Sequence, residues 1–367
     1  MPIPETGKHQ KIPESVYVPL PETTRKTVEI KVGNDLIDQH GNSFKILEKL
    51  GQGGVGNVFK VEDERLGLIR ALKVLNTRAR LDSNIVKRFN REIHLLARMN
   101  NPFVLTAYDV VEFDIEGEKI LGLVTDYVEG RDLGRIIEEH DHLPPQVAVT
   151  LAGEIVLALE SMRELDIVHR DIKPKNVMIQ KFADGTEIAR VGDFGIAALT
   201  EDARIEVFRT AQEDDNVEWA EAITQRGYTV GTAEYMPPEA FRGELPDHRS
   251  DLYSLGITLY EMITGVRPFE GKTIRDFVIA HQMDTPANFE EKGITDVPKW
   301  LEKIVMKLLE KNKKDRYQAA ADVYADLREG ARKEYPELMG KMPFVWDVSP
   351  KKTIDKKTKE TEDRLAA

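Results

Sequence analysis

The amino-acid sequence predicts an α+β protein in which a strand-rich part is followed by a larger, mostly helical part. Between residues 44 and 124, short apolar runs alternate with glycine-containing turns, which is typical of an antiparallel sheet. Beyond that, apolar residues recur at helical spacing, first at 145–165 and again after Asp251. Strands followed by helices are typical of the α+β class. A chain of 367 residues can form two modest domains or one large domain of two lobes.

The composition is that of a soluble globular protein, with 41% hydrophobic and 32% charged residues. No apolar run approaches the roughly 18 residues of a membrane span, and the first residues lack the charged-then-apolar pattern of a secretory signal. The net charge of −12 is spread along the chain, which argues against nucleic acid or an anionic membrane as the main partner. Cysteine is absent, which excludes disulfides and a cysteine nucleophile and agrees with a cytoplasmic location.

Two motifs in the middle of the chain place carboxylate, amide and amino groups close together. The first is H-R-D-I-K-P-K-N at 169–176, and the second is D-F-G at 193–195. Between them, two short runs at 177–179 and 188–191 flank a turn, which predicts a strand pair that returns the second motif to the first. We therefore expect the two motifs to form one site.

The chemistry that suits these residue types is phosphoryl transfer. This reaction needs oxygen ligands for Mg²⁺, cations for the phosphates and a carboxylate near the attacking hydroxyl. Asn176 and Asp193 can supply the metal ligands, and Mn²⁺ would fit the same oxygens. Asp171 can orient the hydroxyl and accept its proton, while Lys173 can offset charge on the transferred group.

Both motifs match the protein-kinase signature H-R-D-x-x-x-x-N plus D-F-G, and its other elements occur elsewhere in the expected order. Over residues 44–332 the chain therefore resembles the eukaryotic-type (Hanks-type) serine/threonine protein kinases, and its compact, cysteine-free core favours a soluble prokaryotic member. The resemblance implies a two-lobed fold. A small N-lobe at 44–125 would hold an antiparallel sheet and one helix, and a hinge at 126–130 would lead to a larger, mostly helical C-lobe at 131–332.

The two ends of the chain lie outside the resemblance. Residues 1–43 are dotted with prolines and are interpreted as an N-terminal extension that either lies on the N-lobe or stays mobile. Within it, the alternating run at 28–32 could add an edge strand. Residues 333–367 carry mixed charge and are interpreted as a solvated or weakly docked tail.

Glycines at 51, 53 and 56 followed by a valine fit the pattern G-x-G-x-x-G-x-V, in which the backbone can approach phosphate oxygens. Lys73 lies inside an apolar strand, where a charge is costly unless paired. The resemblance implies that Lys73 pairs with Glu92 on the next helix and binds the α- and β-phosphates of ATP. It also makes Thr125 a small gatekeeper residue before the hinge. The residues that it assigns to ATP and its metal are Leu50, Gly51, Gly53, Gly54, Gly56, Val58, Ala71, Lys73, Glu92, Thr125, Asp126, Val128, Asn176 and Asp193.

The segment at 195–237 is longer than expected for a compact kinase. Its acidic middle, residues 201–221, is either a docked helical insertion or a mobile loop. Arg170 invites a phosphate group, so we expect autophosphorylation in this segment. The candidate acceptors are Thr224 and Thr229, followed by Thr210.

The stretch at 231–239 resembles the peptide-substrate loop and A-P-E element of the family, with Pro237 in place of alanine. The resemblance implies that Thr232 contacts Asp171 and Lys173. It also implies two scaffold contacts in the C-lobe: Asp251 ties down the backbone of the catalytic loop, and Glu239 pairs with Arg316.

The leading hypothesis is an ATP-dependent kinase that transfers the γ-phosphoryl group to serine or threonine hydroxyls of proteins. A pseudokinase is the competing hypothesis, since fold alone does not secure function, but such proteins typically lose residues of the Lys73, Asp171 or Asp193 type. A small-molecule kinase of related fold, such as one acting on an aminoglycoside, is the third. Thr232 and the Pro237-Pro238-Glu239 stretch favour a peptide substrate instead. The sequence identifies neither the protein substrate nor the oligomeric state.

Overall fold

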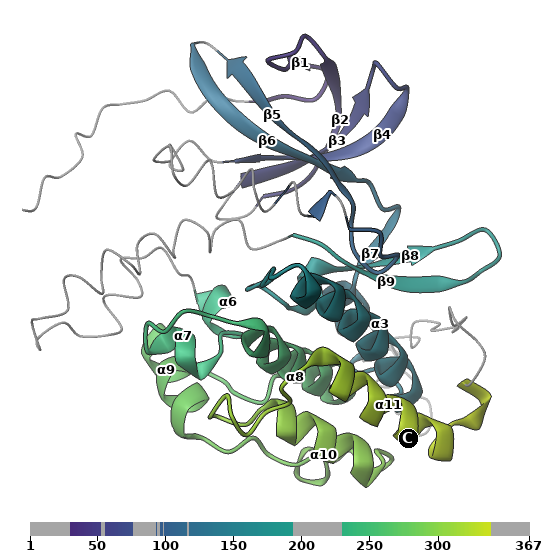
Figure 1. Ribbon diagram of the computed structural model, residues 1–367, viewed down its shortest axis with the longest axis vertical. Coiled ribbons are helices and arrows are strands. Elements are labelled where there is room, and N and C mark those ends of the chain that lie inside the picture. Colours follow the sequence, from purple (N-terminus) through teal and green to yellow (C-terminus); the bar gives the residue numbers. More distant parts are fainter. Residues whose placement is uncertain are drawn as a thin grey trace, which may run out of the picture.

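A computed structural model describes residues 30–52, 56–75, 93, 96–97, 99–115, 117–193 and 230–338, without the side chains of residues 230 and 232. It has two lobes, with an antiparallel sheet in the upper one and a group of helices in the lower one (Figure 1). A small three-stranded sheet lies between them. The predicted α+β class and two-lobed architecture are confirmed.

The N-lobe sheet has six strands in the order β1-β2-β3-β4-β6-β5, and all neighbouring strands are antiparallel. It is built from β1 (Asp35–Ile37), β2 (Ser43–Gln52), β3 (Gly56–Asp63), β4 (Leu68–Leu75), β5 (Ala107–Ile115) and β6 (Glu118–Asp126). The run at 28–32, which could have added an edge strand, forms none over residues 30–32, and residues 28 and 29 lie outside the described residues. The strand begins at Asp35 instead, because there Leu36 lies opposite Phe44 and both side chains are buried.

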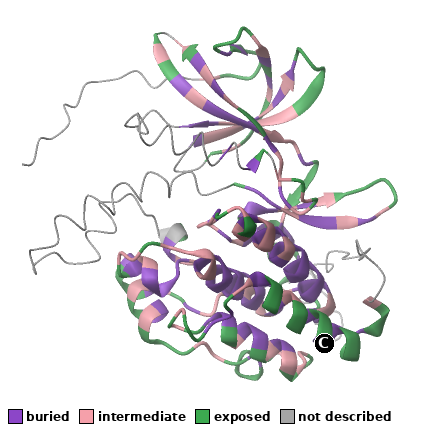
Figure 2. Ribbon diagram, viewed as in Figure 1, coloured by how far each residue is buried: buried purple, intermediate pink, exposed green. Residues whose placement is uncertain are grey.

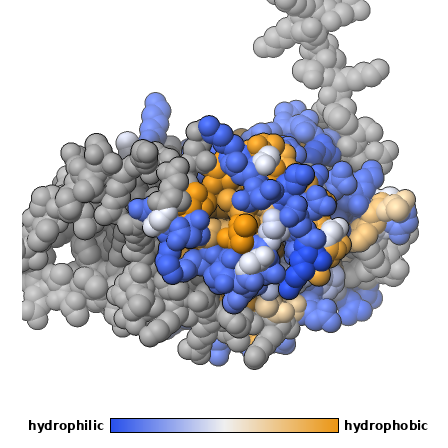
Figure 3. All heavy atoms as spheres, turned by 90° about the horizontal axis from the view of Figure 1, so that it is seen from above, coloured by the Kyte–Doolittle hydropathy of each residue, from blue (hydrophilic) through white to orange (hydrophobic). Residues whose placement is uncertain are grey.

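The two edges of this sheet approach each other. Asp38, just after β1, forms an isolated bridge with Phe113 of β5, and the side chain of Gln39 accepts the backbone N–H of Glu112 at 2.6 Å. The curved sheet encloses an apolar cluster in which Phe44 and Phe113 pack edge to face with ring centroids 6.0 Å apart. Figure 3, which looks down on this end of the molecule, shows hydrophobic residues at its centre and hydrophilic ones around them.

The C-lobe is organised around α3 (Pro145–Glu164) and α8 (His248–Thr264), which are largely buried (Figure 2). The apolar face predicted for α3 is confirmed, since all five of its expected core residues are buried: Val149, Ala152, Val156, Leu159 and Met162. In the described part of the chain, α3 is the helix long and apolar enough to cross a membrane, but 78% of that apolar window is buried inside the fold, as in a core helix. The other helices are α2 (Leu133–His140), α6 (Val230–Ala233), α7 (Pro238–Phe241), α9 (Ile274–Met283), α10 (Lys299–Leu308) and α11 (Ala320–Glu334), with 3₁₀ turns at Pro174–Asn176, Glu290–Lys292 and Pro336–Leu338.

Between the lobes lies the second sheet, formed by β7 (Gly130–Asp132), β8 (Val177–Lys181) and β9 (Glu187–Val191). The predicted strand pair is β8 and β9. Strand β9 also bonds to the chain that leads into β5, because Val191 donates to the carbonyl of Phe103 and accepts from the N–H of Leu105. Strand β9 is therefore held by segments on both of its sides.

The predicted N-lobe helix, which would carry Glu92, lies almost wholly outside the described residues. Ile93 and Leu96, which its spacing places on the apolar face, are helical and buried. Both belong to the large cluster that continues into the C-lobe core.

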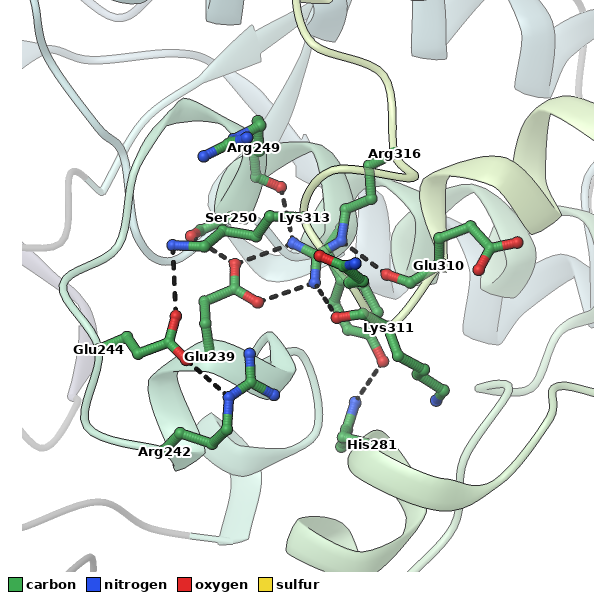
Figure 4. A network of polar contacts seen from close by, with 12 residues as sticks. Glu239, Arg242, Glu244, Arg249, Ser250, His281, Glu310, Lys311, Lys313 and Arg316 are labelled. Atoms are coloured by element: carbon green, nitrogen blue, oxygen red, sulfur yellow. Dashed lines mark hydrogen bonds and ion pairs between the residues drawn. The ribbon is translucent and has the colours of Figure 1, made fainter.

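The predicted pair of Glu239 and Arg316 is present as a buried, two-pronged ion pair (Figure 4). Arg316 donates to the two carboxylate oxygens at 2.8 and 2.7 Å, and both side chains are 0% exposed. Ser250 donates to Glu239 as well, and Arg316 also donates to the carbonyls of Glu310 and Lys311. This network ties α7 and α8 to the chain before α11.

Candidate active site

The register of the N-lobe sheet places the predicted nucleotide residues on one face. Lys73 of β4 lies opposite Val58 of β3, and Ala71 lies opposite Thr125 of β6. Directly opposed residues in an antiparallel pair share a face, and alternate residues of a strand do so too. Val58, Ala71, Lys73 and Thr125 therefore form one surface. Leu75 continues this face into the C-lobe core.

The glycine-rich turn is described at Gly51 and Gly56, whereas Gly53 and Gly54 lie outside the described residues. A Cβ at Gly56 would come within 2.1 Å of the Val74 carbonyl oxygen, so close packing of β3 on β4 already requires a glycine there. A Cβ at Gly51 would meet nothing within 4 Å, so Gly51 borders open space, as a phosphate-binding turn should. Leu50, beside it on β2, is 37% exposed.

At the hinge, the Thr125 hydroxyl donates to the Asp126 carbonyl at 3.3 Å, and Val128 is buried. Asp126 lies opposite Arg70 in the register, so its carboxylate is on the other face of the sheet from Ala71 and Thr125. Any contact of Asp126 with a nucleotide must therefore come from its backbone.

Lys73 contacts Asp193, with its Nζ 2.7 Å from Oδ1 of the carboxylate. The expected partner Glu92 lies outside the described residues. Loss of surrounding water raises the pKa of Asp193, but the charge and hydrogen bond of Lys73 lower it together with smaller effects such as the charge of Lys173, so this pKa lies below its ordinary value. Asp193 also has a positive φ of 57°, a sparsely populated conformation for a residue with a side chain. The carboxylate is therefore ionised and held by its surroundings.

The catalytic-loop residues converge as expected. The amino group of Lys173 is 2.8 Å from each oxygen of Asp171. The amide nitrogen of Asn176 donates to the backbone carbonyl of Asp171 at 2.7 Å and to its carboxylate at 2.8 Å. The Asp171 side chain is 28% exposed, so it is fixed by two neighbours and still accessible.

His169 joins this loop to the strand that carries Asp193. Its Nε2 lies 3.0 Å from the carbonyl oxygen of Gly192, and its Nδ1 lies 3.3 Å from the backbone nitrogen of Asp171. A neutral ring with the proton on Nε2 satisfies both contacts. Burial lowers the pKa of His169 to about 4, which agrees with a neutral ring near pH 7.

Beneath the loop, Asp251 of α8 accepts the backbone N–H groups of His169 and Arg170 at 2.8 and 2.7 Å. This is the tie that we expected. Burial raises the pKa of Asp251 to about 7, although both N–H groups act to lower it. Arg170 adopts a positive φ of 68° at this point, so the tie holds the loop in a conformation that costs free energy.

The donor set suits a hard divalent cation. The hydrogen bonds described above use the amide nitrogen of Asn176 and one oxygen of Asp193, which leaves an amide oxygen and a carboxylate oxygen outside them. Oxygen ligands of this kind are the ones that Mg²⁺ prefers. No cluster of three or more His, Cys, Asp or Glu side chains suited to a metal is found among the described residues, so a metal here would rely on these two residues, substrate phosphates and water.

Several predicted features cannot be placed. The acidic stretch at 201–221 and the candidate acceptors Thr210, Thr224 and Thr229 lie outside the described residues, and so does the side chain of Thr232. The sequence reasoning also missed polar residues that the structure brings to the hinge, namely Arg70, Tyr108 and Arg190. Arg70 and Arg190 each lie between apolar neighbours in a strand, in β4 and β9 respectively, which is the kind of signal that identified Lys73.

A small antiparallel sheet over a helical lobe, with Lys73 and Asp193 beside the catalytic-loop cluster, defines the two-lobed protein kinase fold. Residues 44–325 match the protein kinase domain family. The chain therefore belongs to this family.

Curated relatives carry matching names. A probable serine/threonine-protein kinase of Clostridium perfringens is 32% identical over 328 residues, which are 89% of this chain and 41% of the relative. The serine/threonine-protein kinase PknB of Mycobacterium tuberculosis is 33% identical over 296 residues, 80% of this chain and 44% of PknB. The chain thus spans less than half the length of these relatives.

Solved structures agree on the fold. The kinase domain of Mycobacterium tuberculosis PknI matches with a TM-score of 0.58 at 21% identity, over 82% of this chain and 99% of that one. Residues 1–466 of Rad53, crystallised with AMP-PNP, match with a TM-score of 0.59 at 21% identity, over 77% of this chain and 64% of that one.

Proposed function

We propose that this protein is an ATP-dependent kinase that transfers the γ-phosphoryl group of ATP to serine or threonine hydroxyls of proteins. The observation that carries the proposal is the accessible Asp171 carboxylate, held by Lys173 and Asn176, near the Lys73–Asp193 pair. Family membership and the names of the relatives support it. A cytoplasmic location, where ATP is available, belongs to the same proposal.

In this proposal each residue has one task. The glycine-rich turn and the hinge hold ATP, Lys73 binds its phosphates, and Asn176 and Asp193 hold Mg²⁺, which neutralises charge on the phosphates when bound. Asp171 accepts a hydrogen bond from the attacking hydroxyl and takes its proton as the bond to phosphorus forms. Lys173 offsets negative charge on the transferred group. Part of the output would be autophosphorylation at Thr224, Thr229 or Thr210.

The test is phosphate transfer by the purified, phosphatase-treated protein with Mg²⁺ and ATP. Intact-mass spectrometry would detect autophosphorylation, and labelled casein with phosphoamino-acid analysis would detect transfer to serine and threonine. We expect transfer by the wild type, and a loss of about 10²-fold or more in Asp171→Asn, because general-base catalysis contributes that much. Asp109→Asn makes the same substitution at an exposed position of β5 and should keep full activity.

Three outcomes would count against the proposal. Phosphate on kanamycin but not on casein would favour a small-molecule kinase. Nucleotide binding without any transfer would favour a pseudokinase. Equal transfer by the wild type and Asp171→Asn would mean that a contaminating kinase is responsible.

A further inference from the structure

The carboxylate of Asp126 is the centre of a second polar cluster, on the face of the sheet opposite to the nucleotide residues. One of its oxygens accepts the hydroxyl of Tyr108 at 2.6 Å and lies 3.6 Å from Arg70. The other accepts from Arg190 at 2.9 Å and from the backbone N–H of Thr106 at 3.2 Å. The Asp126 side chain is partly buried, with 16% of its surface exposed, and its carboxylate is shared between two arginines.

The two arginines have the same charge and nearly the same exposure, 14% for Arg70 and 13% for Arg190, but different attachments. Arg70 is the direct register partner of Asp126 within the N-lobe sheet, so backbone hydrogen bonds already join their strands. Arg190 belongs to β9 of the other sheet. It also donates to the carbonyl of Val104 at 2.8 Å and to the side chain of Gln180 at 3.2 Å.

Both ends of the Arg190–Asp126 contact continue directly into the candidate active site. Asp126 ends β6, and the hinge follows it. Arg190 is three residues before Asp193, and Gly192 between them donates to the carbonyl of Asn176 at 2.9 Å. A shift of β9 relative to β6 would therefore move the metal-binding residues relative to the hinge.

The negative charge of the Asp126 carboxylate favours a cation beside it. Burial raises the pKa of Asp126, but its hydrogen bond from Tyr108 and the charge of Arg190 lower it by more, so the carboxylate is ionised near neutral pH. A buried ionised carboxylate needs a cation close by. In a variant that lacks one arginine, the other still lies near the carboxylate, at 3.6 Å for Arg70 or 2.9 Å for Arg190, so both variants keep a cation beside Asp126.

We propose that Arg190 is a positioning residue for nucleotide binding, which holds the hinge at a fixed distance from β9, the strand that leads to Asp193, through its bonds to Asp126 and Val104. It thereby sets the spacing between the ends of the site that take the adenine and the metal-bound phosphates. The inference rests on the proposed function, because ATP is the ligand that reaches from one end to the other.

The experiment compares Arg190→Met with Arg70→Met, which removes the same charge from the same carboxylate. Binding of AMP-PNP with Mg²⁺ is measured by calorimetry, and KM and kcat by phosphate transfer. We expect Arg190→Met to weaken AMP-PNP binding about tenfold, within the usual range for coupling between sites. KM for ATP should rise by a similar factor with kcat nearly unchanged, because the lost interaction acts equally on the ground and transition states. Arg70→Met should change the dissociation constant for AMP-PNP and the KM for ATP by less than about twofold each.

Two further measurements show whether a loss of affinity comes from lost positioning or from unfolding of the variant. Thermal unfolding shows whether each variant is folded at the assay temperature, and Arg190→Lys should recover part of the affinity, because an ammonium group still reaches Asp126 but lacks the guanidinium fork. If Arg190→Met does not fold, Arg190→Gln takes its place.

Two outcomes would overturn the proposal. Equal weakening of AMP-PNP binding by the Arg70 and Arg190 variants would mean that Arg190 acts as a counter-charge alone. An unchanged KM for ATP in Arg190→Met would mean that Arg190 does not position the nucleotide. A wild-type protein that does not bind nucleotide would refute the proposed function and this inference with it.

Discussion

The Glu239–Arg316 pair in the C-lobe and the Lys73–Asp193 pair at the candidate active site have the same closest N···O distance, 2.7 Å, but differ in burial and in the number of further partners. Both partners of the C-lobe pair are 0% exposed and bonded to further groups, whereas Asp193 is 46% exposed. A buried ion pair with all its hydrogen bonds made cannot exchange partners without a large cost. Lys73 itself is 14% exposed, so this pair borders solvent on the side of its carboxylate, and there the lysine can exchange Asp193 for a phosphate. The distance between two charges therefore says little about their role, and burial says much more.

Breaking the buried pair should have the largest effect. We expect Glu239→Ala to lower the free energy of unfolding by about 3–5 kcal/mol, because Arg316 is left as an uncompensated buried charge. The free energy of unfolding is measured by urea unfolding followed by circular dichroism. Glu244→Ala is the matched control, since Glu244 contacts Arg242 and Lys313 in the same region but is 42% exposed, and it should cost about 1 kcal/mol or less. Similar losses for both variants would contradict the comparison.

Breaking the Lys73–Asp193 pair should lower activity and leave the fold intact. Lys73→Met removes the cation from the proposed phosphate site, and we expect a loss of about 10²–10³-fold in phosphate transfer, as for other preorganised groups that stabilise a transition state. The free energy of unfolding should change by less than about 1 kcal/mol. The same protein preparation serves for both measurements. A strongly destabilised Lys73→Met protein would show that this pair is part of the scaffold.

Glu154 on α3 sharpens the comparison, because no cation among the described residues pairs with this buried carboxylate. It is 1% exposed and accepts the backbone N–H of Ala189 at 2.7 Å, while no described group bonds to its other oxygen. Burial raises its pKa from 4.5 to about 8, although the N–H bond acts to lower it. By contrast, the pKa of Glu239 is lowered, because the hydrogen bonds and charge of Arg316 outweigh its burial.

The sign of the pH effect follows from this raised pKa. The folded protein binds the Glu154 proton more tightly than the unfolded chain, so the stabilisation is complete below about pH 4.5 and is lost as the pH rises to about 8. Within that window, Glu154 should contribute a fall in stability of about 1.4 kcal/mol per pH unit. Glu154→Gln should flatten the profile, as measured by urea unfolding at several pH values. Parallel profiles for the two proteins would contradict the assignment.

An exposed pair should have the smallest effect. Lys119 lies 2.6 Å from Glu112, closer than either pair above, but its side chain is 73% exposed. Water already solvates such charges well, so we expect Lys119→Met to leave the midpoint of urea unfolding unchanged within error. If Lys119→Met moved the midpoint of urea unfolding as far as Glu239→Ala does, a short distance between two charges would indicate stabilisation even at an exposed site, and the comparison would be wrong.

The sequence predicted those contacts that short motifs encode. Asp251, Arg316 and the catalytic-loop cluster were expected because each belongs to a recognisable pattern. The contact of Arg190 with Asp126 was not, because it depends on how two sheets meet, and the two residues are 64 positions apart. The sequence did not show a second reason for a glycine at position 56, namely that close packing on Val74 requires it regardless of any phosphate, and the phosphate contact itself stays a prediction.

The position of the first strand, which starts at Asp35 and leaves residues 30–32 out, has a similar explanation. Alternation at 28–32 is a local signal, whereas pairing depends on which residue can bury a side chain opposite Phe44, and Leu36 does so. Register in a sheet with one buried face is set by such contacts across strands. Periodicity therefore indicates that a strand is present more reliably than it indicates where the strand begins.

The approach of β1 to β5 also affects how copies of this protein meet. An open sheet exposes a row of unpaired N–H and C=O groups, onto which a strand from another molecule can add. Here the Asp38–Phe113 bridge and the bond from Glu112 to Gln39 occupy part of both edges. Strand addition at that point would first have to separate these contacts, so the curvature of the N-lobe sheet helps to protect the protein against aggregation.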